Sequence, residues 1–244
     1  MTKQIPNSIT ILNLLCGVMA VFFAINGRAE TAAYLIFAAA LFDFFDGFAA
    51  RALKAYSEIG RELDSLADLI SFGMAPAAIL SNIMYGLKAH ATGQLFFDMG
   101  VRDQIITLSP FILVAFSALR LAKFNTDTRQ SEVFLGLTTT ATGIFTASFA
   151  LLIKSGAAWA MSLLSPIFLI VLVSVFCALL ISEIPMFSLK FKSIEWKGNE
   201  DRFVFLALGL ALIAFLGLGG ISLLIVFYVL FSVVVELIVW ARSI

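Results

Sequence analysis

The chain has 244 residues, of which 61% are hydrophobic and only 13% are charged. A soluble domain of this length contains about half apolar and a quarter charged residues, so the excess indicates an integral membrane protein. Lys plus Arg and Asp plus Glu number 16 each, which removes any general electrostatic case for binding nucleic acid.

Long stretches without charge predict helices that cross the membrane, because about 20 apolar residues span the hydrocarbon. The stretch 203–235 is long enough for two helices, with glycines at 217, 219 and 220 in the turn between them. The segment 31–50 is apolar except for Asp43 and Asp46. The sequence therefore predicts an all-α polytopic bundle of about eight transmembrane helices in one domain, 1–244, with helices at 8–25, 31–52, 62–86, 104–124, 133–153, 159–182, 203–218 and 221–241.

The cationic residues predict the orientation of these helices, since cytoplasmic connections carry an excess of Lys and Arg. One side of the bundle receives Lys3, Arg51, Lys54, Arg61, Arg120, Lys123, Arg129, Lys190, Lys192, Lys197, Arg202 and Arg242. The other side receives only Arg28, Lys88, Arg102 and Lys154. We therefore expect a multi-pass protein of the cell membrane with both termini in the cytoplasm. The first helix is expected to be retained, because no small-x-small cleavage site precedes Arg28.

Two carboxylates interrupt the second predicted helix near its cytoplasmic end. Asp43 and Asp46 are three residues apart, and Gly47, Ala50 and Arg51 follow on the same side. One face of this helix thus carries two acids, two very small residues and a guanidinium. The small residues leave space for a ligand beside the backbone, and Arg51 suits a phosphate group in that space.

The third predicted helix begins with a second stripe of the same kind, in which Gly60, Asp64 and Asp68 are spaced by four. The short connection is expected to fold this helix back against the second one. Four carboxylates, including Asp43 and Asp46, would then meet at the membrane boundary, where their mutual repulsion requires cations.

Oxygen ligands without His or Cys suit Mg²⁺, Mn²⁺ or Ca²⁺, and four carboxylates can hold two such ions. The alternative is that each acid is an ordinary interfacial residue paired with Arg51, Lys54 or Arg61. The repetition of acids and small residues around one short turn favours the metal site for the set as a whole.

Residues 43–68 fit the pattern DxxDGxxAR, eight residues, then GxxxDxxxD at every defined position. In this the sequence resembles the CDP-alcohol phosphotransferases. The resemblance implies that two divalent ions, Mg²⁺ or Mn²⁺, bridge the pyrophosphate of a CDP-linked lipid. It makes Asp43, Asp46, Asp64 and Asp68 metal ligands and Asp68 also the general base. Gly47, Ala50 and Gly60 would make room for the cytidine nucleotide, and Arg51 would bind its phosphates.

Three further segments, IPNSITILNLLCG, DSLADLISFGMAPA and ALRLAKFNT, are similar to the membrane-embedded members of the family that use L-serine. The similarity implies that CDP-diacylglycerol and L-serine are the substrates, that the active site lies on the cytoplasmic side among membrane lipids, and that the protein is a homodimer. One departure concerns the start of the fifth helix. Where the family pattern has GLP and another proline, this chain has Gly136, Leu137, Thr138, Thr139 and Thr140.

The end of the fourth predicted helix offers further candidates for binding the acceptor. Arg120 could bind the serine carboxylate or the lipid phosphate, and Asn125 could hydrogen-bond the acceptor. The equally weighted alternative makes Arg120 and Lys123 positive-inside anchors.

Two other functions stay open at this point. A sister enzyme would use glycerol-3-phosphate or inositol phosphate, and such acceptors demand more cationic residues around the pocket. A cation transporter would also place acids within the membrane, but its site belongs near the midplane, and it is marked by broken helices and often by repeated halves. Neither feature is visible in the sequence.

Overall fold

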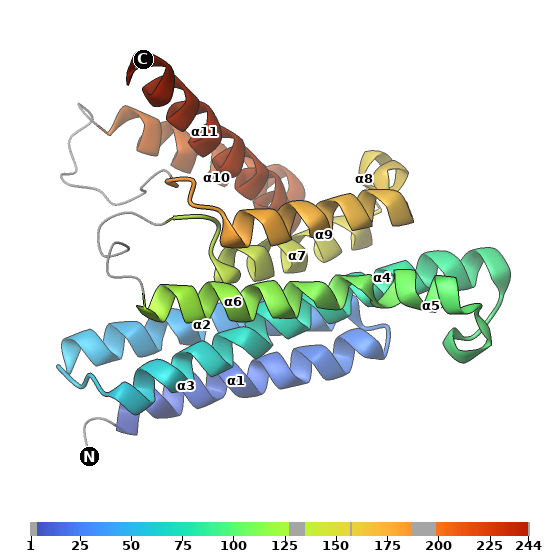
Figure 1. Cartoon of the computed structure of the whole chain (residues 1–244), viewed down its shortest axis with the longest axis horizontal. Coiled ribbons are helices and arrows are strands. Elements are labelled where there is room, and N and C mark those ends of the chain that lie inside the picture. Colours follow the sequence, from blue (N-terminus) through green and yellow to red (C-terminus); the bar gives the residue numbers. More distant parts are fainter. Residues whose placement is uncertain (1–3, 127–134, 157, 187–198, 244) are drawn as a thin grey trace.

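The computed structural model describes residues 4–126, 135–156, 158–186 and 199–243. In this part of the chain the elements are nearly all helical (Figure 1). In order they are α1 (Gln4–Ile25), α2 (Ala29–Ala52), α3 (Glu58–Asp68), the π-helix η1 (Leu69–Met74), α4 (Ala75–Thr92), the short 3-10 turn η2 (Phe96–Asp98), α5 (Val101–Leu108), the 3-10 turn η3 (Ser109–Phe111), α6 (Ile112–Thr126), α7 (Thr139–Lys154), α8 (Ala158–Leu163), α9 (Pro166–Ile181), α10 (Glu200–Leu216), the 3-10 turn η5 (Gly217–Gly219) and α11 (Gly220–Ser243).

Each of the predicted membrane-crossing segments corresponds to a helical segment of the described chain. The spans 4–25, 29–52, 58–92 and 101–126 are long and apolar enough to cross a membrane, and 202–238 contains the predicted hairpin, with η5 as its turn. The apolar helices α7 and α9 supply the remaining two segments. The prediction of an all-α, multi-pass membrane protein is confirmed.

The predicted boundaries differ where polar residues extend or break a helix. The third segment runs over 58–92 rather than 62–86, because Ser57 caps an amphipathic first part, α3. The sixth is interrupted before Pro166, where Ser165 Oγ accepts a hydrogen bond from the Phe168 amide and starts a new helix. The fifth begins at Thr139 after the capping residue Thr138, and its predicted first residues, 133–134, lie outside the described residues.

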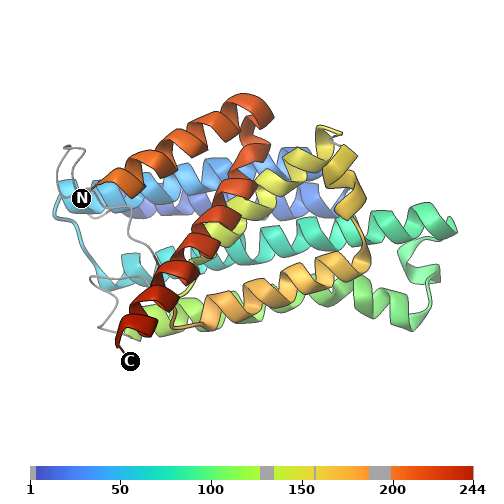
Figure 2. The same ribbon diagram turned by 90° about the horizontal axis from the view of Figure 1, so that it is seen from above.

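Small residues determine how closely the helices pack. Alanines of α1 and α2 lie in one buried cluster that also contains Phe72 of the π-helix. Short side chains let neighbouring backbones approach, which is the usual way to gain contact energy in a membrane. A polar contact is made by Ser148 of α7, whose hydroxyl donates a hydrogen bond to the Leu218 carbonyl (2.7 Å) and accepts one from the Ser222 amide (2.7 Å). This pair of bonds attaches the turn of the α10–α11 hairpin to α7, which α11 crosses obliquely (Figure 2).

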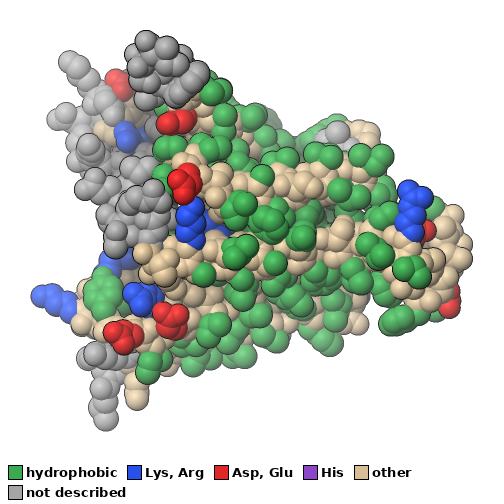
Figure 3. All heavy atoms as spheres, in the orientation of Figure 1, with side chains coloured by type: hydrophobic (Ala, Val, Ile, Leu, Met, Phe, Trp, Pro, Cys, Tyr) green, Lys and Arg blue, Asp and Glu red, His purple; other side chains and the backbone are tan. Residues whose placement is uncertain are grey.

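The outer surface matches a membrane environment. Hydrophobic side chains cover the middle of the visible face, while charged groups gather toward its two ends (Figure 3). The connection between α2 and α3 and the ends of α6 and α9 lie at the same end of the bundle, at the left in Figure 1. Residues brought to this end come from helices far apart in the sequence.

One expected contact is different in the structure. The third helix was expected to fold back directly against the second, but α3 packs against α1. A cavity lies between α2 and α3 instead, because the small residues of both stripes face each other across it. The consequence is that α1 becomes a wall of the candidate site.

Candidate active site

Three of the predicted metal ligands come together across two helices. One carboxylate oxygen from each of Asp43, Asp64 and Asp68 lies within 4.8 Å of the others. Asp43 comes from α2, while Asp64 and Asp68 occupy one face of α3. The start of α3 is fixed by Ser57, whose hydroxyl accepts a hydrogen bond from the Gly60 amide at 3.0 Å. Asp46 lies outside this group of three and lines a cavity together with Asp64.

Two features of the acids suit a divalent cation, which are their spacing and, in the described part of the chain, the presence of carboxylate oxygens that lack hydrogen-bond partners. Among the described residues, Asp46 Oδ2 and Asp64 Oδ1 are buried without a hydrogen-bond partner. A buried carboxylate oxygen without a partner is costly, and a bound cation removes that cost. The donors are all carboxylate oxygens, which is the ligand type preferred by Mg²⁺, Mn²⁺ and Ca²⁺. A cluster of acids capable of holding a metal ion is therefore present.

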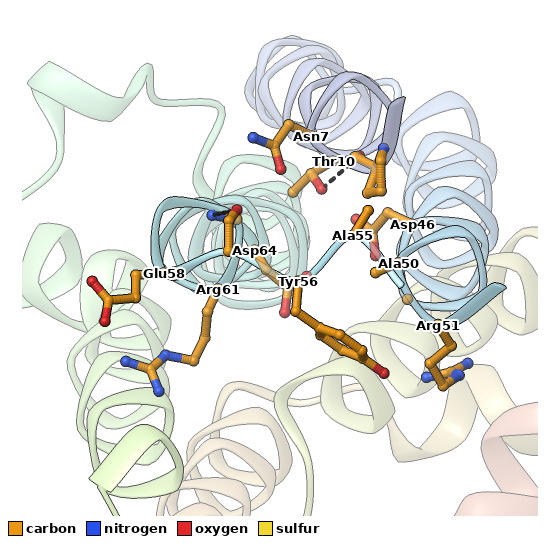
Figure 4. Close-up of a pocket in the computed structure, with 14 residues that line it drawn as sticks. Asn7, Thr10, Asp46, Ala50, Arg51, Ala55, Tyr56, Glu58, Arg61 and Asp64 are labelled. Carbon is orange, nitrogen blue, oxygen red and sulfur yellow. Dashed lines mark hydrogen bonds between the residues drawn. The ribbon is translucent and has the colours of Figure 1, made fainter. Parts of the chain in front are cut away.

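A cavity of about 710 Å³ opens beside the acids between α1, α2 and α3. The predicted nucleotide-binding residues Gly47, Ala50, Arg51 and Gly60 all line it. Figure 4 shows the side chains of Arg51 and Arg61 extending from opposite sides of this cavity, with Tyr56 between them. The cavity thus combines cationic groups with a floor of very small residues.

Two glycines of the motif lie against polar side chains that line this cavity. A Cβ atom at Gly47 would lie 3.4 Å from Arg51 Nη1, so the guanidinium folds back over the glycine. A Cβ atom at Gly60 would lie 2.9 Å from Asn7 Oδ1, so glycine lets the start of α3 approach α1. Gly60 therefore has a steric role in this chain, whereas the distance at Gly47 is an ordinary van der Waals contact.

A second cavity, of about 460 Å³, lies on the other side of the acids. Its lining includes Asp43, Asp64 and Asp68 together with Arg120 and Asn125 from α6 and the threonines 138–140 at the start of α7. Arg61 and Asp64 line both cavities. The acid cluster therefore lies between two spaces that are large enough for different ligands.

Arg120 and Asn125 are held by hydrogen bonds within this second cavity. Arg120 is only 4% exposed, its Nε donates to the Leu137 carbonyl at 3.3 Å, and its guanidinium lies 5.6 Å from the Phe124 ring centroid. Asn125 Nδ2 donates to Ser65 Oγ at 2.9 Å. Lys123 instead pairs with Glu183 at 2.7 Å on the exposed surface. A surface anchor is thus a fitting description of Lys123 but not of the buried Arg120.

Sequence reasoning missed several residues of the site. Asn7 and Thr10 line the first cavity, and Asn13, one step further along the same face of α1, donates from Nδ2 to Asp68 Oδ1 at 3.2 Å. Their spacing of three within an apolar helix was the available signal. The sequence patterns indicate Arg61 only as a cytoplasmic cation or a partner for the acids, and the threonines 138–140 only as a departure from the family pattern.

Comparison with known proteins agrees with this geometry. The profile of the family described as CDP-alcohol phosphatidyltransferase matches residues 3–184, which include both cavities and all four aspartates. Proteins named CDP-diacylglycerol–serine O-phosphatidyltransferase are similar to the chain. That of Bacillus subtilis is 35% identical over 135 residues, covering 55% of this chain and 68% of the relative.

Similar relatives occur in other bacteria and in an archaeon. The protein of the same name from Mycobacterium leprae is 36% identical over 190 residues, or 75% of this chain and 57% of the relative. The one from Methanocaldococcus jannaschii is 30% identical over 151 residues, or 62% of each. The matched regions thus span less than two thirds of these two relatives. Since the family profile covers most of the chain, the protein belongs to the CDP-alcohol phosphatidyltransferase family.

Proposed function

We propose that the protein transfers the phosphatidyl group of CDP-diacylglycerol to L-serine, with release of CMP and formation of phosphatidylserine. The observation that carries this proposal is the acid cluster between two cavities. One cavity is lined by the nucleotide-binding motif, and the other is lined by Asp68, by two guanidiniums and by the amide of Asn125. The names of the relatives support the same donor and acceptor.

Asp43, Asp46, Asp64 and Asp68 would hold two divalent ions, Mg²⁺ or Mn²⁺, at the boundary between the cavities. Bound ions would neutralise the charge that develops on the pyrophosphate. Gly47, Ala50 and Gly60 leave room for the cytidine nucleotide, as the wide cavity beside them allows. Arg51 supplies a guanidinium that suits its phosphates.

Asp68 would accept the proton of the serine hydroxyl from its position in the wall of the second cavity. The serine oxygen then attacks the phosphorus that carries diacylglycerol, a new phosphorus–oxygen bond forms, and the bond to CMP breaks. Arg120 would bind the serine carboxylate and Asn125 would hydrogen-bond the acceptor. No covalent intermediate with the protein is required, because the acceptor oxygen attacks the phosphorus directly.

The position of the acids also bears on the transporter alternative. Asp43 and Asp46 lie in the second half of α2, and Asp64 and Asp68 lie before the apolar part of the third span. A transport site belongs near the midplane of the membrane, so this placement favours the enzyme. We place the active site at the cytoplasmic side of the cell membrane, where soluble serine reaches it and the acyl chains stay in the bilayer.

This orientation predicts which introduced cysteines react from each side of the membrane. A cysteine at Lys54, in the connection between α2 and α3, should be labelled only from the cytoplasm, and one at Arg102 only from outside. The measurement is maleimide labelling of sealed vesicles, in a background where Cys16 and Cys177 are replaced by alanine. The reverse labelling pattern would place the site away from cytosolic serine and contradict the orientation.

The role of Arg120 predicts a specific kinetic effect. Arg120→Ala should raise KM for serine about tenfold or more, because a charge-assisted hydrogen bond to a carboxylate is lost. KM for CDP-diacylglycerol should change much less. Lys123→Ala is the matched control, since Lys123 lies on the same helix and pairs with Glu183. Equal changes in the two KM values would remove Arg120 from the acceptor site.

The proposed reaction is tested by the transfer of labelled L-serine into lipid. Membranes containing the protein should form labelled phosphatidylserine only when CDP-diacylglycerol is present, and CMP should appear in equal amount. Labelled lipid formed without a CDP-linked donor would contradict the proposal, because exchange of headgroups would then explain the product.

A further inference from the structure

A fully buried side chain of the first helix, Asn13, contacts the proposed base, Asp68. Asn13 has no solvent exposure, and its Nδ2 donates to Asp68 Oδ1 at 3.2 Å. A carboxylate can only accept hydrogen bonds, so the amide nitrogen is the atom of Asn13 that must face it. The bond joins two residues that are 55 positions apart in the sequence.

The backbone of α1 is fixed at the same place. The carbonyl oxygen of Asn13 accepts a hydrogen bond from Ser71 Oγ at 3.0 Å, and Ser71 lies in the π-helix that directly follows Asp68. One turn further along α1, a Cβ atom at Gly17 would lie 2.8 Å from Ser71 Cα, so glycine is needed for this approach. The contact between α1 and the π-helix therefore fixes Asn13 and Asp68 relative to each other.

Asparagine at position 13 leaves a polar atom unpaired within the part of the chain that the structure describes, which indicates that packing alone does not explain this residue. Among the described residues, Asn13 Oδ1 is buried without a hydrogen-bond partner. An apolar side chain of similar size would fill the same space in an apolar helix without leaving a polar atom unpaired. The presence of an amide at this position is therefore explained by the hydrogen bond that its nitrogen donates to Asp68.

The hydrogen bond distinguishes the two oxygens of the carboxylate. Oδ1 of Asp68 is engaged by Asn13, and Asp68, although only 8% exposed, forms part of the lining of the second cavity. Oδ2 is the oxygen left for the two roles proposed for Asp68, which are ligation of a metal ion and acceptance of the proton of an acceptor hydroxyl. Holding the carboxylate in one orientation also avoids the loss of rate that results when a catalytic group is displaced from its productive position.

We propose that Asn13 is a positioning residue that holds Asp68 Oδ1 and so directs Oδ2 toward the acceptor hydroxyl. This role rests on the proposed function, in which Asp68 is the base. Asn13 does not belong to the lining of either cavity. Its removal should therefore lower kcat and leave the binding of the donor unchanged.

The test compares Asn13→Ala with Asn13→Ser, which leave nearly the same space but differ by one hydroxyl donor. We expect kcat to fall about 10- to 100-fold in Asn13→Ala, the effect of losing one hydrogen bond to a charged group. KM for CDP-diacylglycerol should stay within about twofold. Asn13→Ser should have a higher kcat than Asn13→Ala, because its hydroxyl can donate to the carboxylate directly or through one water molecule.

Asn26→Ala is the matched control, since Asn26 lies just beyond the other end of the same helix, where its Nδ2 donates to the Phe22 carbonyl at 2.7 Å. This variant should keep the wild-type kcat. A kcat of Asn13→Ala within about twofold of wild type would overturn the proposal, as would equal losses in the alanine and serine variants.

If Asn13→Ala does not fold, Asn13→Leu, which has a similar size and no hydrogen-bond donor, takes its place. A lowered kcat with unchanged donor KM supports the proposal, and wild-type kinetics overturn it. Failure of the proposed function is separable, because the wild-type protein itself would then not transfer phosphatidyl groups to serine. In that case the same variants are compared with whichever acceptor releases CMP from the wild type.

Discussion

Replacing Asp68 with asparagine is expected to abolish phosphatidyl transfer while the protein still folds and binds CDP-diacylglycerol. The amide occupies the same space, and its carbonyl oxygen can still accept the hydrogen bond from Asn13 Nδ2. It cannot accept the proton of the serine hydroxyl, however, and loss of a general base alone costs about 10²- to 10⁴-fold in rate. Loss of a metal ligand adds to this effect. CMP release by the purified variant measures the rate, and binding of labelled CDP-diacylglycerol measures the retained site.

Asp98→Asn is the matched control for this substitution. Asp98 is an exposed acid in the connection that contains η2, away from both cavities. Its replacement makes the same change of charge and should leave the rate unaltered. Near-normal turnover by Asp68→Asn would remove Asp68 from the role of base and, with it, the basis for the role of Asn13.

Removal of divalent cations is expected to have an equally large effect. The protein should be inactive in excess chelator and regain activity with Mg²⁺ or Mn²⁺, because unpaired carboxylates repel the pyrophosphate of the donor. Asp43→Asn should need a higher metal concentration for half-maximal activity, whereas Asp98→Asn should not. Metal titrations of CMP release measure both effects. Full activity in excess chelator would refute the metal mechanism.

Local sequence patterns were sufficient to predict the elements that carry the site. Uncharged stretches identify the helices because a membrane requires long apolar segments. The spacing of Asp64 and Asp68 places them on one face of a helix whatever the rest of the fold does. The pattern over 43–68 is long enough to indicate the family, and the family profile agrees.

The contacts between distant helices could not be predicted in the same way. That α3 packs against α1 depends on the shape of both helices and on the approach allowed by Gly17 and Gly60. The buried Arg120 donates a hydrogen bond to the carbonyl of Leu137, which lies in a segment without regular secondary structure. No sequence signal marks the π-helix after Asp68. Asn13 was visible as a polar residue in an apolar helix, but its partner was not.

The acceptor is the part of the account that the family pattern determines least, and an acceptor comparison on the purified protein therefore tests the central claim most directly. With CDP-diacylglycerol as donor, CMP release should be driven by L-serine far better than by glycerol-3-phosphate or inositol phosphate. The reason is that the lining of the second cavity combines two guanidiniums and the Asn125 amide with three carboxylates, and this balance of charge suits a zwitterionic amino acid better than a dianionic phosphate. CMP release driven by glycerol-3-phosphate and not by serine would contradict the acceptor assignment while leaving the chain in its family.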